Sequence, residues 1–312
     1  MTGIFTYRNF SLHDTPALDG KVAVVTKPFT PHGKNGNTET ESISENMTPE
    51  WNLCNVTWAI FTTSTPPLNI SSKKTDKVDI LICNAGLGVP YQFKRSPHNI
   101  DRIFATNCIG HFVLVTRLLP LLRNAASSTS SKVGSRVIFT SSSLHMLCRE
   151  IDFELLASPS RVKWPVLFDG MWRYGRSQLG NILLAKEFSR RLQDESEHSH
   201  PSSENIYVNS YFPGNIVTNQ WNDWSSYFGS FIGSCMRVVG RLCGQTVDDG
   251  AATAIYLATS DQVRDRNLRG RYFLPVATPG DPSPMAQDPN LGSSLWDWIE
   301  THVAQTLGSK EK

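Results

Sequence analysis

The chain of 312 residues lacks the sequence signals of several protein classes. Its six cysteines are scattered without a CxxC pair, which argues against a metal site or a disulfide framework and favours reduced, mostly buried thiols. The net charge is +2 and basic residues form no concentrated run, so nucleic acid is not an expected partner. No apolar run approaches the roughly 18 residues of a membrane span, so we expect no transmembrane segment.

The N-terminal sequence MTGIFTYRNFSLHD has no basic region followed by an apolar core, so we expect no secretory signal and a cytoplasmic location. Hydrophobic residues make up 39% of the chain and charged residues 19%, as in ordinary soluble globular proteins. The length suits one large domain or two modest ones, and the pattern described below favours a single domain over 1–312.

Short β-branched runs alternate with amphipathic segments along the chain. One amphipathic segment extends from Asn99 to Leu122, a second carries Tyr174, and a third opens at Asp248 and Asp249, whose charge suits a helix N-terminus. Strands separated by helices predict a doubly wound α/β sheet of the Rossmann type. The predicted strands are 21–26, 78–86, 136–143, 205–214 and 269–277.

The segment 27–77 breaks this alternation. It has no apolar periodicity, and it offers one strand-like run at 55–63. A complete mononucleotide-binding half would need further strands and crossovers between Thr26 and Val78, which take roughly 70 residues at typical element and loop lengths. The interval is shorter than that, so we predict an irregular segment and an incomplete N-terminal half of the fold.

Five motifs appear along the rest of the chain in a recognisable order. They are NAG (84–86), NCIG (107–110), TSSSLH (140–145), YGRS (174–177) and PGNIVT (213–218). In this order they resemble the short-chain dehydrogenase/reductase family, and the first three look most similar to its retinol-dehydrogenase and WW-domain-oxidoreductase branch. The resemblance implies an NAD(P)-dependent oxidoreductase that interconverts an alcohol and a carbonyl on a lipophilic small molecule, which in fungal relatives often serves secondary metabolism.

The resemblance also implies catalytic roles. Ser142 would hydrogen-bond the substrate oxygen, Tyr174 would donate or accept the proton, and Asn107 would present its backbone carbonyl to a proton-relay water. Each residue has a plainer structural interpretation, as a turn-forming serine, a core tyrosine or a poor helix former. The five motifs together favour the functional interpretation. His145 is interpreted as structural, since this chemistry already has its acid.

Cofactor binding is assigned by the same resemblance, with NADP favoured on family grounds, NAD left open and no metal expected. The assigned residues are Asn84, Ala85 and Gly86 on the adenosine side, Tyr174 and Gln178 on the catalytic helix, and Ile216 and Thr218 at the nicotinamide carboxamide. The aromatic-rich segment 219–245 is either a substrate lid or a packed helix-loop segment. Association into a homo-oligomer is left open.

Gln178 departs from the family pattern, which has a lysine at this place. A tyrosine phenol has a reference pKa near 10, and a lysine four residues on shares the helix face of Tyr174 and favours the phenolate. Each unit by which the tyrosine pKa stays higher without the lysine corresponds to about 1.4 kcal/mol, or a tenfold smaller fraction of phenolate. Glutamine can keep a hydrogen bond to the cofactor but supplies no charge.

A second departure follows Thr26, where the family continues with a glycine-rich turn that lets a pyrophosphate reach backbone N–H groups at a helix N-terminus. Here the chain continues with Lys27 and Pro28. Two alternatives to an active oxidoreductase are therefore left open. One is a non-catalytic binding or scaffold protein with the same fold, and the other is an altered gene product whose segment 27–77 has lost the glycine-rich turn.

Overall fold

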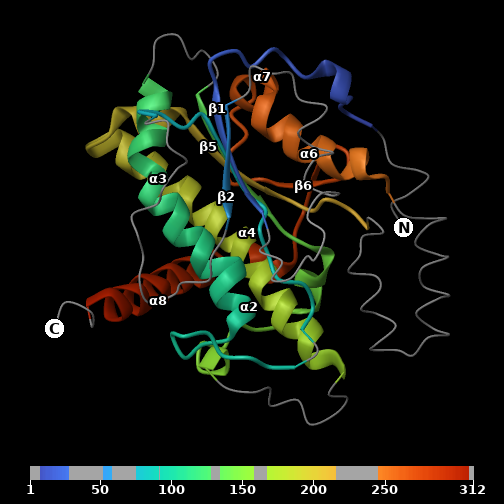
Figure 1. Cartoon of the computed structure of the whole chain (residues 1–312), viewed down its shortest axis with the longest axis vertical. Helices are drawn as coiled ribbons and strands as arrows, with labels where there is room; N and C mark the ends of the chain where they lie inside the picture. Colours follow the sequence, from blue (N-terminus) through green and yellow to red (C-terminus); the bar gives the residue numbers. More distant parts are fainter. Residues whose placement is uncertain are drawn as a thin grey trace.

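The computed structural model describes residues 8–27, 52–57, 75–90, 92–127, 134–157, 167–215 and 245–308. These residues form a seven-stranded sheet of order β2-β1-β3-β4-β5-β6-β7, with helices on both faces (Figure 1). All neighbouring strands pair in parallel except β6 and β7. The strands are β1 Val22–Lys27, β2 Asn52–Thr57, β3 Ile80–Cys83, β4 Ser135–Thr140, β5 Ile206–Tyr211, β6 Tyr272–Leu274 and β7 Thr278–Gly280.

Two groups of helices cover the two faces of this sheet, α3, α4 and α8 on one face and α6 and α7 on the other (Figure 1). The helices are α2 Arg102–Phe104, the π-helical turn η2 Ala105–Ile109, α3 Gly110–Ser127, α4 Leu167–His198, α6 Val247–Thr259, α7 Asp261–Asp265 and α8 Pro289–Gly308. Short 3₁₀ turns are η1 Leu12–Asp14, η3 Ser143–Leu147, η4 Leu155–Ala157, η5 Pro201–Asn205 and η6 Pro284–Gln287.

The hydrophobic core has one layer on each face of the sheet, because successive strand residues point to opposite faces. Val24, Leu81 and Val137 belong to the layer under α3, α4 and α8. Their chain neighbours Ala23 and Ile80 belong to the layer under α6 and α7. Burial on both faces explains why these strands are continuous apolar runs, and it confirms the predicted doubly wound α/β fold.

The strand-like run expected within the segment 27–77 corresponds to β2, with different bounds. Asn52–Thr57 pairs in parallel with the whole of β1, from Val22 opposite Asn52 to Lys27 opposite Thr57. The sequence placed a strand at 55–63, a few residues too late. The backbone N–H and C=O groups of β2 are hydrogen-bonded by those of β1, whatever the side chains are. A segment whose side chains show only a weak strand pattern can therefore still form a strand beside β1.

The last predicted strand, 269–277, is also too long. The strand β6 ends at Leu274, and Pro275, which has no backbone N–H to continue a ladder, follows directly. The chain then returns as β7, whose antiparallel register pairs Tyr272 with Gly280. The predicted helix at 248–258 is confirmed within one residue at each end, and a capping box between Thr246 and Asp249 fixes its start.

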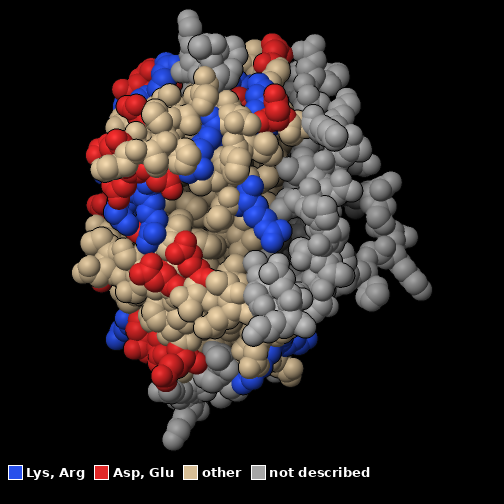
Figure 2. All heavy atoms as spheres, turned by 90° about the vertical axis from the view of Figure 1, so that its left-hand side faces the viewer, with Lys and Arg blue, Asp and Glu red and all other residues tan. Residues whose placement is uncertain are grey.

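One stretch among the described helices, Arg102–Ser127, is long and apolar enough to cross a membrane by length and composition alone. About 67% of its most hydrophobic window is buried inside the protein, where Phe104, Leu114 and Leu118 join the core layer under α3. Such burial is typical of the core helix of a sheet protein. On the molecular face in Figure 2, acidic and basic side chains lie interspersed.

The strand order places a switch point between β1 and β3. From β1 the chain moves to β2 on one side and then crosses to β3 on the other side. Open α/β sheets bind ligands at the carboxyl ends of strands at such a point. Thr26 is the last residue but one of β1 and Asn84 follows β3, so this edge of the sheet is where a functional site is expected.

Candidate active site

The turn Asn84-Ala85-Gly86 is fixed to the ends of two strands. The buried Thr26 Oγ1 accepts hydrogen bonds from the backbone N–H groups of Asn84 (2.9 Å) and Ala85 (2.7 Å). The Thr140 hydroxyl, at the end of β4, donates to Asn84 Oδ1 over 3.2 Å. The turn is therefore held open at the switch point by side chains from β1 and β4.

Asn107 lies at the centre of the π-helical turn η2, fully buried. Its Oδ1 accepts from the Leu87 N–H (2.8 Å), and its Nδ2 donates to the Leu87 carbonyl (2.9 Å) and the Ser177 hydroxyl (3.2 Å). A Cβ on Gly86 would lie 3.4 Å from Asn107 Oδ1, closer than most side-chain contacts. The side chain of Asn107 thus ties the turn to α4, and π-helical turns are frequent at functional sites.

His111 is a site residue that sequence reasoning missed. Its buried ring hydrogen-bonds the Asn107 backbone and the Asn181 side chain, which both favour the protonated ring, but burial outweighs them and lowers its pKa to about 4. His111 is therefore neutral at physiological pH. Its spacing of four from Asn107, one helical turn on, is the signal that could have placed the two together.

Ser142 and Tyr174 are brought together by two elements that are far apart in sequence. Ser142 follows β4 and caps η3, where its hydroxyl accepts from the Leu144 N–H over 3.3 Å. Tyr174 lies on α4, and its hydroxyl is hydrogen-bonded with the Ser142 side chain. A Cβ on Gly175 would lie only 2.5 Å from the Leu144 carbonyl oxygen, so the glycine after the tyrosine permits this close approach of α4 to η3.

Burial raises the pKa of Tyr174 to about 12, and the hydrogen bond with Ser142 lowers it only in part. Within the part of the chain that the structure describes, no cation lowers this pKa. At the family lysine position, Gln178 is buried, with its Nε2 3.5 Å from the Ser177 hydroxyl. The backbone carbonyl of Gln178 accepts from the Ser141 hydroxyl over 3.0 Å. Tyr174 is therefore an uncharged phenol at neutral pH, in a well-fixed position.

His145 holds the backbone at Ser142 in place. Its Nδ1 lies 2.6 Å from the Ser142 carbonyl oxygen, and its Nε2 accepts from the Ser283 N–H over 3.1 Å. Because a carbonyl only accepts, the ring carries its proton on Nδ1 and is neutral. Burial lowers its pKa, which preserves that state. The geometry agrees with the structural role predicted for His145.

Three large hydrophobic side chains of the described residues are exposed to solvent. Met146 and Leu147, which follow His145 in η3, are exposed by 60% and 42%, and Val247 at the start of α6 by 67%. Gln245 lies two residues before Val247 and fixes the segment after β5, because its Oε1 accepts from the Asn215 N–H over 3.1 Å.

Two predicted cofactor residues, Ile216 and Thr218, lie outside the described residues, as does the predicted lid segment except for Gln245. The other predicted site residues gather at one edge of the sheet. They are Asn84, Ala85 and Gly86 after β3, Asn107 in η2, Ser142 after β4, and Tyr174 and Gln178 on α4. The turn assigned to the adenosine side of a dinucleotide and the tyrosine assigned to its nicotinamide side thus lie along the carboxyl edge of the sheet, where open α/β sheets bind ligands.

Comparisons with known proteins agree with this arrangement. The family model described as short chain dehydrogenase matches residues 68–147, which contain the first three motifs. The chloroplastic short-chain dehydrogenase TIC 32 A of Brassica napus is 32% identical over 71% of this chain and 62% of its own length. Human retinol dehydrogenase 14 is 30% identical over 73% of this chain and 59% of its own length. The chain thus spans about 60% of the length of these curated relatives.

Solved structures show the same fold. An uncharacterised protein from Mycobacterium paratuberculosis superposes with a TM-score of 0.60 at 19% identity, covering 96% of this chain and 97% of its own. A short-chain dehydrogenase/reductase from Burkholderia xenovorans superposes with a TM-score of 0.51 at 17% identity, covering 82% and 95%. With the motifs in order on a doubly wound sheet and these relatives in sequence, the chain belongs to the short-chain dehydrogenase/reductase family, in the branch of the retinol dehydrogenases and the WW-domain oxidoreductase.

Proposed function

We propose that the protein is an NAD(P)-dependent oxidoreductase that interconverts a carbonyl and an alcohol on a lipophilic small molecule. The observation that carries this proposal is the hydrogen-bonded pair of Ser142 and Tyr174, placed beside the Asn84-Ala85-Gly86 turn at the switch point of the sheet. A dinucleotide bound along this edge would meet Asn84 to Gly86 at one end, and Tyr174 and Gln178 at the other. When bound, the nicotinamide supplies or accepts a hydride.

The residues of the chain provide the acid and the orientation for this reaction. In reduction, the Tyr174 hydroxyl protonates the substrate oxygen while the Ser142 hydroxyl hydrogen-bonds the same oxygen. Because the pKa of Tyr174 is raised to about 12, the phenol is fully protonated at neutral pH and ready as an acid. Oxidation needs the phenolate, which burial disfavours. Carbonyl reduction is therefore the proposed direction at neutral pH.

Three finer assignments accompany this proposal. A lipophilic substrate is supported by the exposed Met146, Leu147 and Val247 and by the name of the relative retinol dehydrogenase 14. NADP is proposed before NAD on the family resemblance alone. A role in secondary metabolism is in keeping with fungal relatives from Aspergillus calidoustus and Armillaria gallica. A cytoplasmic location and association into a homo-oligomer stay predictions.

The experiment that tests the proposed function measures cofactor binding and turnover separately. NADPH and NADH are titrated against the protein by fluorescence, and a panel of lipophilic ketones is then incubated with the cofactor that binds. We expect binding with consumption of NADPH in wild type, and binding without consumption in Tyr174→Phe. Turnover that persists in Tyr174→Phe would contradict the assigned acid.

A second candidate function is a non-catalytic binding protein with the same fold. The observation that favours it is that no cation of the described residues acts on Tyr174, together with the buried, uncharged Gln178. This candidate predicts no turnover of any ketone in the panel, in wild type or in a Gln178→Lys variant. Lipophilic ligands would then bind with the same affinity whether NADPH is present or absent.

A further inference from the structure

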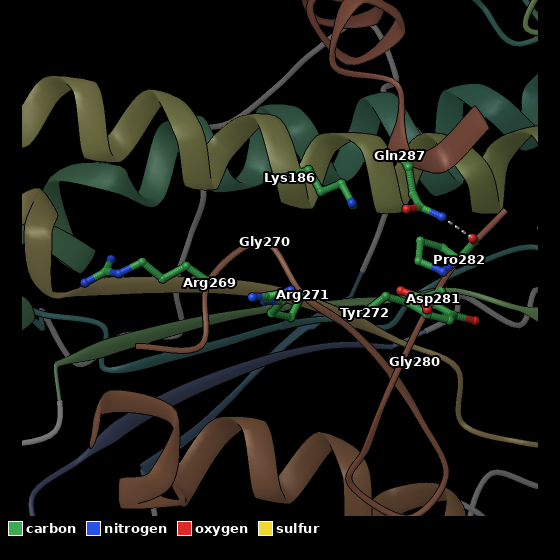
Figure 3. A pocket seen from close by; sticks show the side chains of 9 residues that line it. All are labelled: Lys186, Arg269, Gly270, Arg271, Tyr272, Gly280, Asp281, Pro282 and Gln287. Atoms are coloured by element: carbon green, nitrogen blue, oxygen red, sulfur yellow. Dashed lines mark hydrogen bonds between the residues drawn. The ribbon is translucent and has the colours of Figure 1, made fainter. Parts of the chain in front are cut away.

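A polar cavity of about 270 Å³ lies between the C-terminal half of α4, the start of β6 and the turn after β7 (Figure 3). On α4 its nearest residue is Lys186, twelve positions after Tyr174, which corresponds to roughly 18 Å along the helix at 1.5 Å per residue. The Lys186 end of the cavity is therefore remote from Tyr174, while the lining residue Tyr272 packs against the His145 ring, with 5.4 Å between the ring centroids. Its lining residues are Lys186, Arg269, Gly270, Arg271, Tyr272, Gly280, Asp281, Pro282 and Gln287.

Two cations of this lining act on one another. The pKa of Lys186 is lowered by burial first and by the Arg271 guanidinium second, and the Asp281 carboxylate opposes them. Within the described part of the chain, the side chains of Lys186 and Arg271 form no hydrogen bond and no ion pair. Two positive charges thus lie at one cavity with a single carboxylate nearby, and their repulsion is only partly offset.

The other cations of the region have firm structural partners, which sets Lys186 and Arg271 apart. Arg269 also lines the cavity, but its guanidinium donates to the Ile206 carbonyl (2.9 Å) and stacks on the Tyr207 ring. Figure 3 shows its side chain directed away from the other lining residues. On α4, Arg190 and Arg191 both pair with Glu187.

The backbone around the cavity is held in a fixed shape. The N–H of Arg271 donates to the buried Asn209 Oδ1 over 2.9 Å, and Gly270 before it has a φ of 59°, which favours glycine. On the opposite rim, Gln287 Nε2 donates to the Pro282 carbonyl over 2.9 Å. A ligand would therefore enter a preformed site and would not have to order it.

We propose that this cavity binds a small tetrahedral oxyanion, a phosphate group or its sulfate analogue, between Lys186 and Arg271. A guanidinium offers a planar fork of N–H donors and an ammonium a compact charge, and both are common phosphate ligands. The volume is below the roughly 300–1,000 Å³ of pockets for drug-sized ligands, which suits an ion or a single phosphoryl group. A bound dianion also removes the repulsion between the two cations.

This proposal does not depend on the oxidoreductase activity, so its test needs no substrate. Thermal unfolding of the full chain is followed while inorganic phosphate replaces chloride at constant ionic strength. The variants are Lys186→Gln and Arg271→Gln, and the matched control is Arg117→Gln, which removes one charge from an exposed position on α3. A ligand that binds the folded state raises the midpoint of unfolding with its concentration.

We expect phosphate and sulfate to raise the midpoint in wild type and in Arg117→Gln, and each cavity variant to weaken the apparent affinity by about tenfold or more. Equal responses in all four proteins would show general ion effects and would overturn the proposal. A stronger response to acetate than to phosphate would also overturn it, because a planar carboxylate would then be the preferred ligand. If a cavity variant does not fold without phosphate, Lys186→Arg serves as the second variant. It keeps the positive charge at the cavity, so it should retain phosphate binding.

Discussion

Two parts of the candidate site differ in how many hydrogen bonds hold them: the catalytic side, around Ser142 and Tyr174, and the cofactor side, around the turn 84–86. On the catalytic side, the Ser141 hydroxyl donates to the Gln178 carbonyl, Asn181 Nδ2 donates to the Thr140 carbonyl, and His145 bridges Ser142 and Ser283. On the cofactor side, the Asn84-Ala85-Gly86 turn is held mainly by Thr26 and by Asn107. The chain after Thr26 carries no glycine-rich turn.

The comparison teaches that geometry and electrostatics can change separately within one site. The two hydroxyls that the chemistry requires are in contact, and a glycine permits that contact. The charge that would ionise Tyr174 is absent from α4, because Gln178 takes that position. In the proposed function, Tyr174 therefore has the arrangement of a general acid but lacks the neighbouring charge that would make it a base. Four variants sharpen or break this comparison.

Tyr174→Phe should have the largest effect. Removing a positioned general acid costs about 10²- to 10⁴-fold in rate, while cofactor affinity should stay within a few-fold of wild type because the ring is kept. Initial rates of ketone-dependent NADPH oxidation measure the loss of rate, and fluorescence titration measures the cofactor affinity. A loss of cofactor binding as large as the loss of rate would mean that the hydroxyl serves binding.

His111 should make stability depend on pH. Its folded-state pKa of about 4 lies below the ordinary 6.5, so stabilisation is complete above pH 6.5 and is lost as the pH falls towards 4. At about 1.4 kcal/mol per pKa unit, the loss amounts to roughly 3 kcal/mol. Urea unfolding at pH 7 and pH 4.5 should show a smaller difference for His111→Gln. His145 and His302 also have lowered pKa values and remain in both proteins, so the comparison isolates His111.

Gly175→Ala should disturb the contact between α4 and η3. The new methyl group would lie 2.5 Å from the Leu144 carbonyl oxygen, and overpacking of this kind costs about 1–3 kcal/mol. Activity should fall further than stability explains, because Tyr174 moves away from Ser142. The matched control is Gly292→Ala on α8, where the nearest atom is 4.0 Å away. Equal losses of stability and activity in Gly175→Ala and Gly292→Ala would argue against a close approach of α4 to η3.

Gln178→Lys should have the smallest effect of the four. An ammonium four residues from Tyr174 favours the phenolate, so the pKa of Tyr174 falls and each unit gives about tenfold more reactive base. Alcohol oxidation should rise with a pH optimum closer to neutrality, while ketone reduction changes less. The measurement is the pH dependence of both directions at saturating cofactor. A flat response at full cofactor occupancy would defeat the claim that the missing charge limits oxidation.

The sequence predicted the part of the fold and site that local pattern determines. Buried parallel strands are continuous apolar runs, so β1, β3, β4 and β5 were found near their true positions. The short motifs singled out Ser142, Tyr174 and Asn107, which the fold brings to one edge of the sheet, and their catalytic roles stay predictions.

The remaining parts depend on tertiary contacts that no local pattern records. The strand β2 is defined by its pairing with β1, and α8 by aromatic packing of Trp296 against Phe112 and Phe188. His111 was missed because its only sequence signal, the spacing of four from Asn107, is also that of any core residue one helical turn further on. The cavity joins Lys186 on α4 to residues of β6 and of the turn after β7, which lie more than eighty positions later in the sequence.

The ionisation of Tyr174 itself is the most direct measurement. Tyrosine labelled with ¹³C at Cζ reports phenolate formation by NMR, and comparison of wild type with Tyr174→Phe assigns the signal. The account predicts that Tyr174 stays protonated from pH 6 to pH 10, in keeping with a pKa raised to about 12. A Tyr174 that ionises near neutral pH would contradict it, because another cation would then be taking the place of the missing lysine.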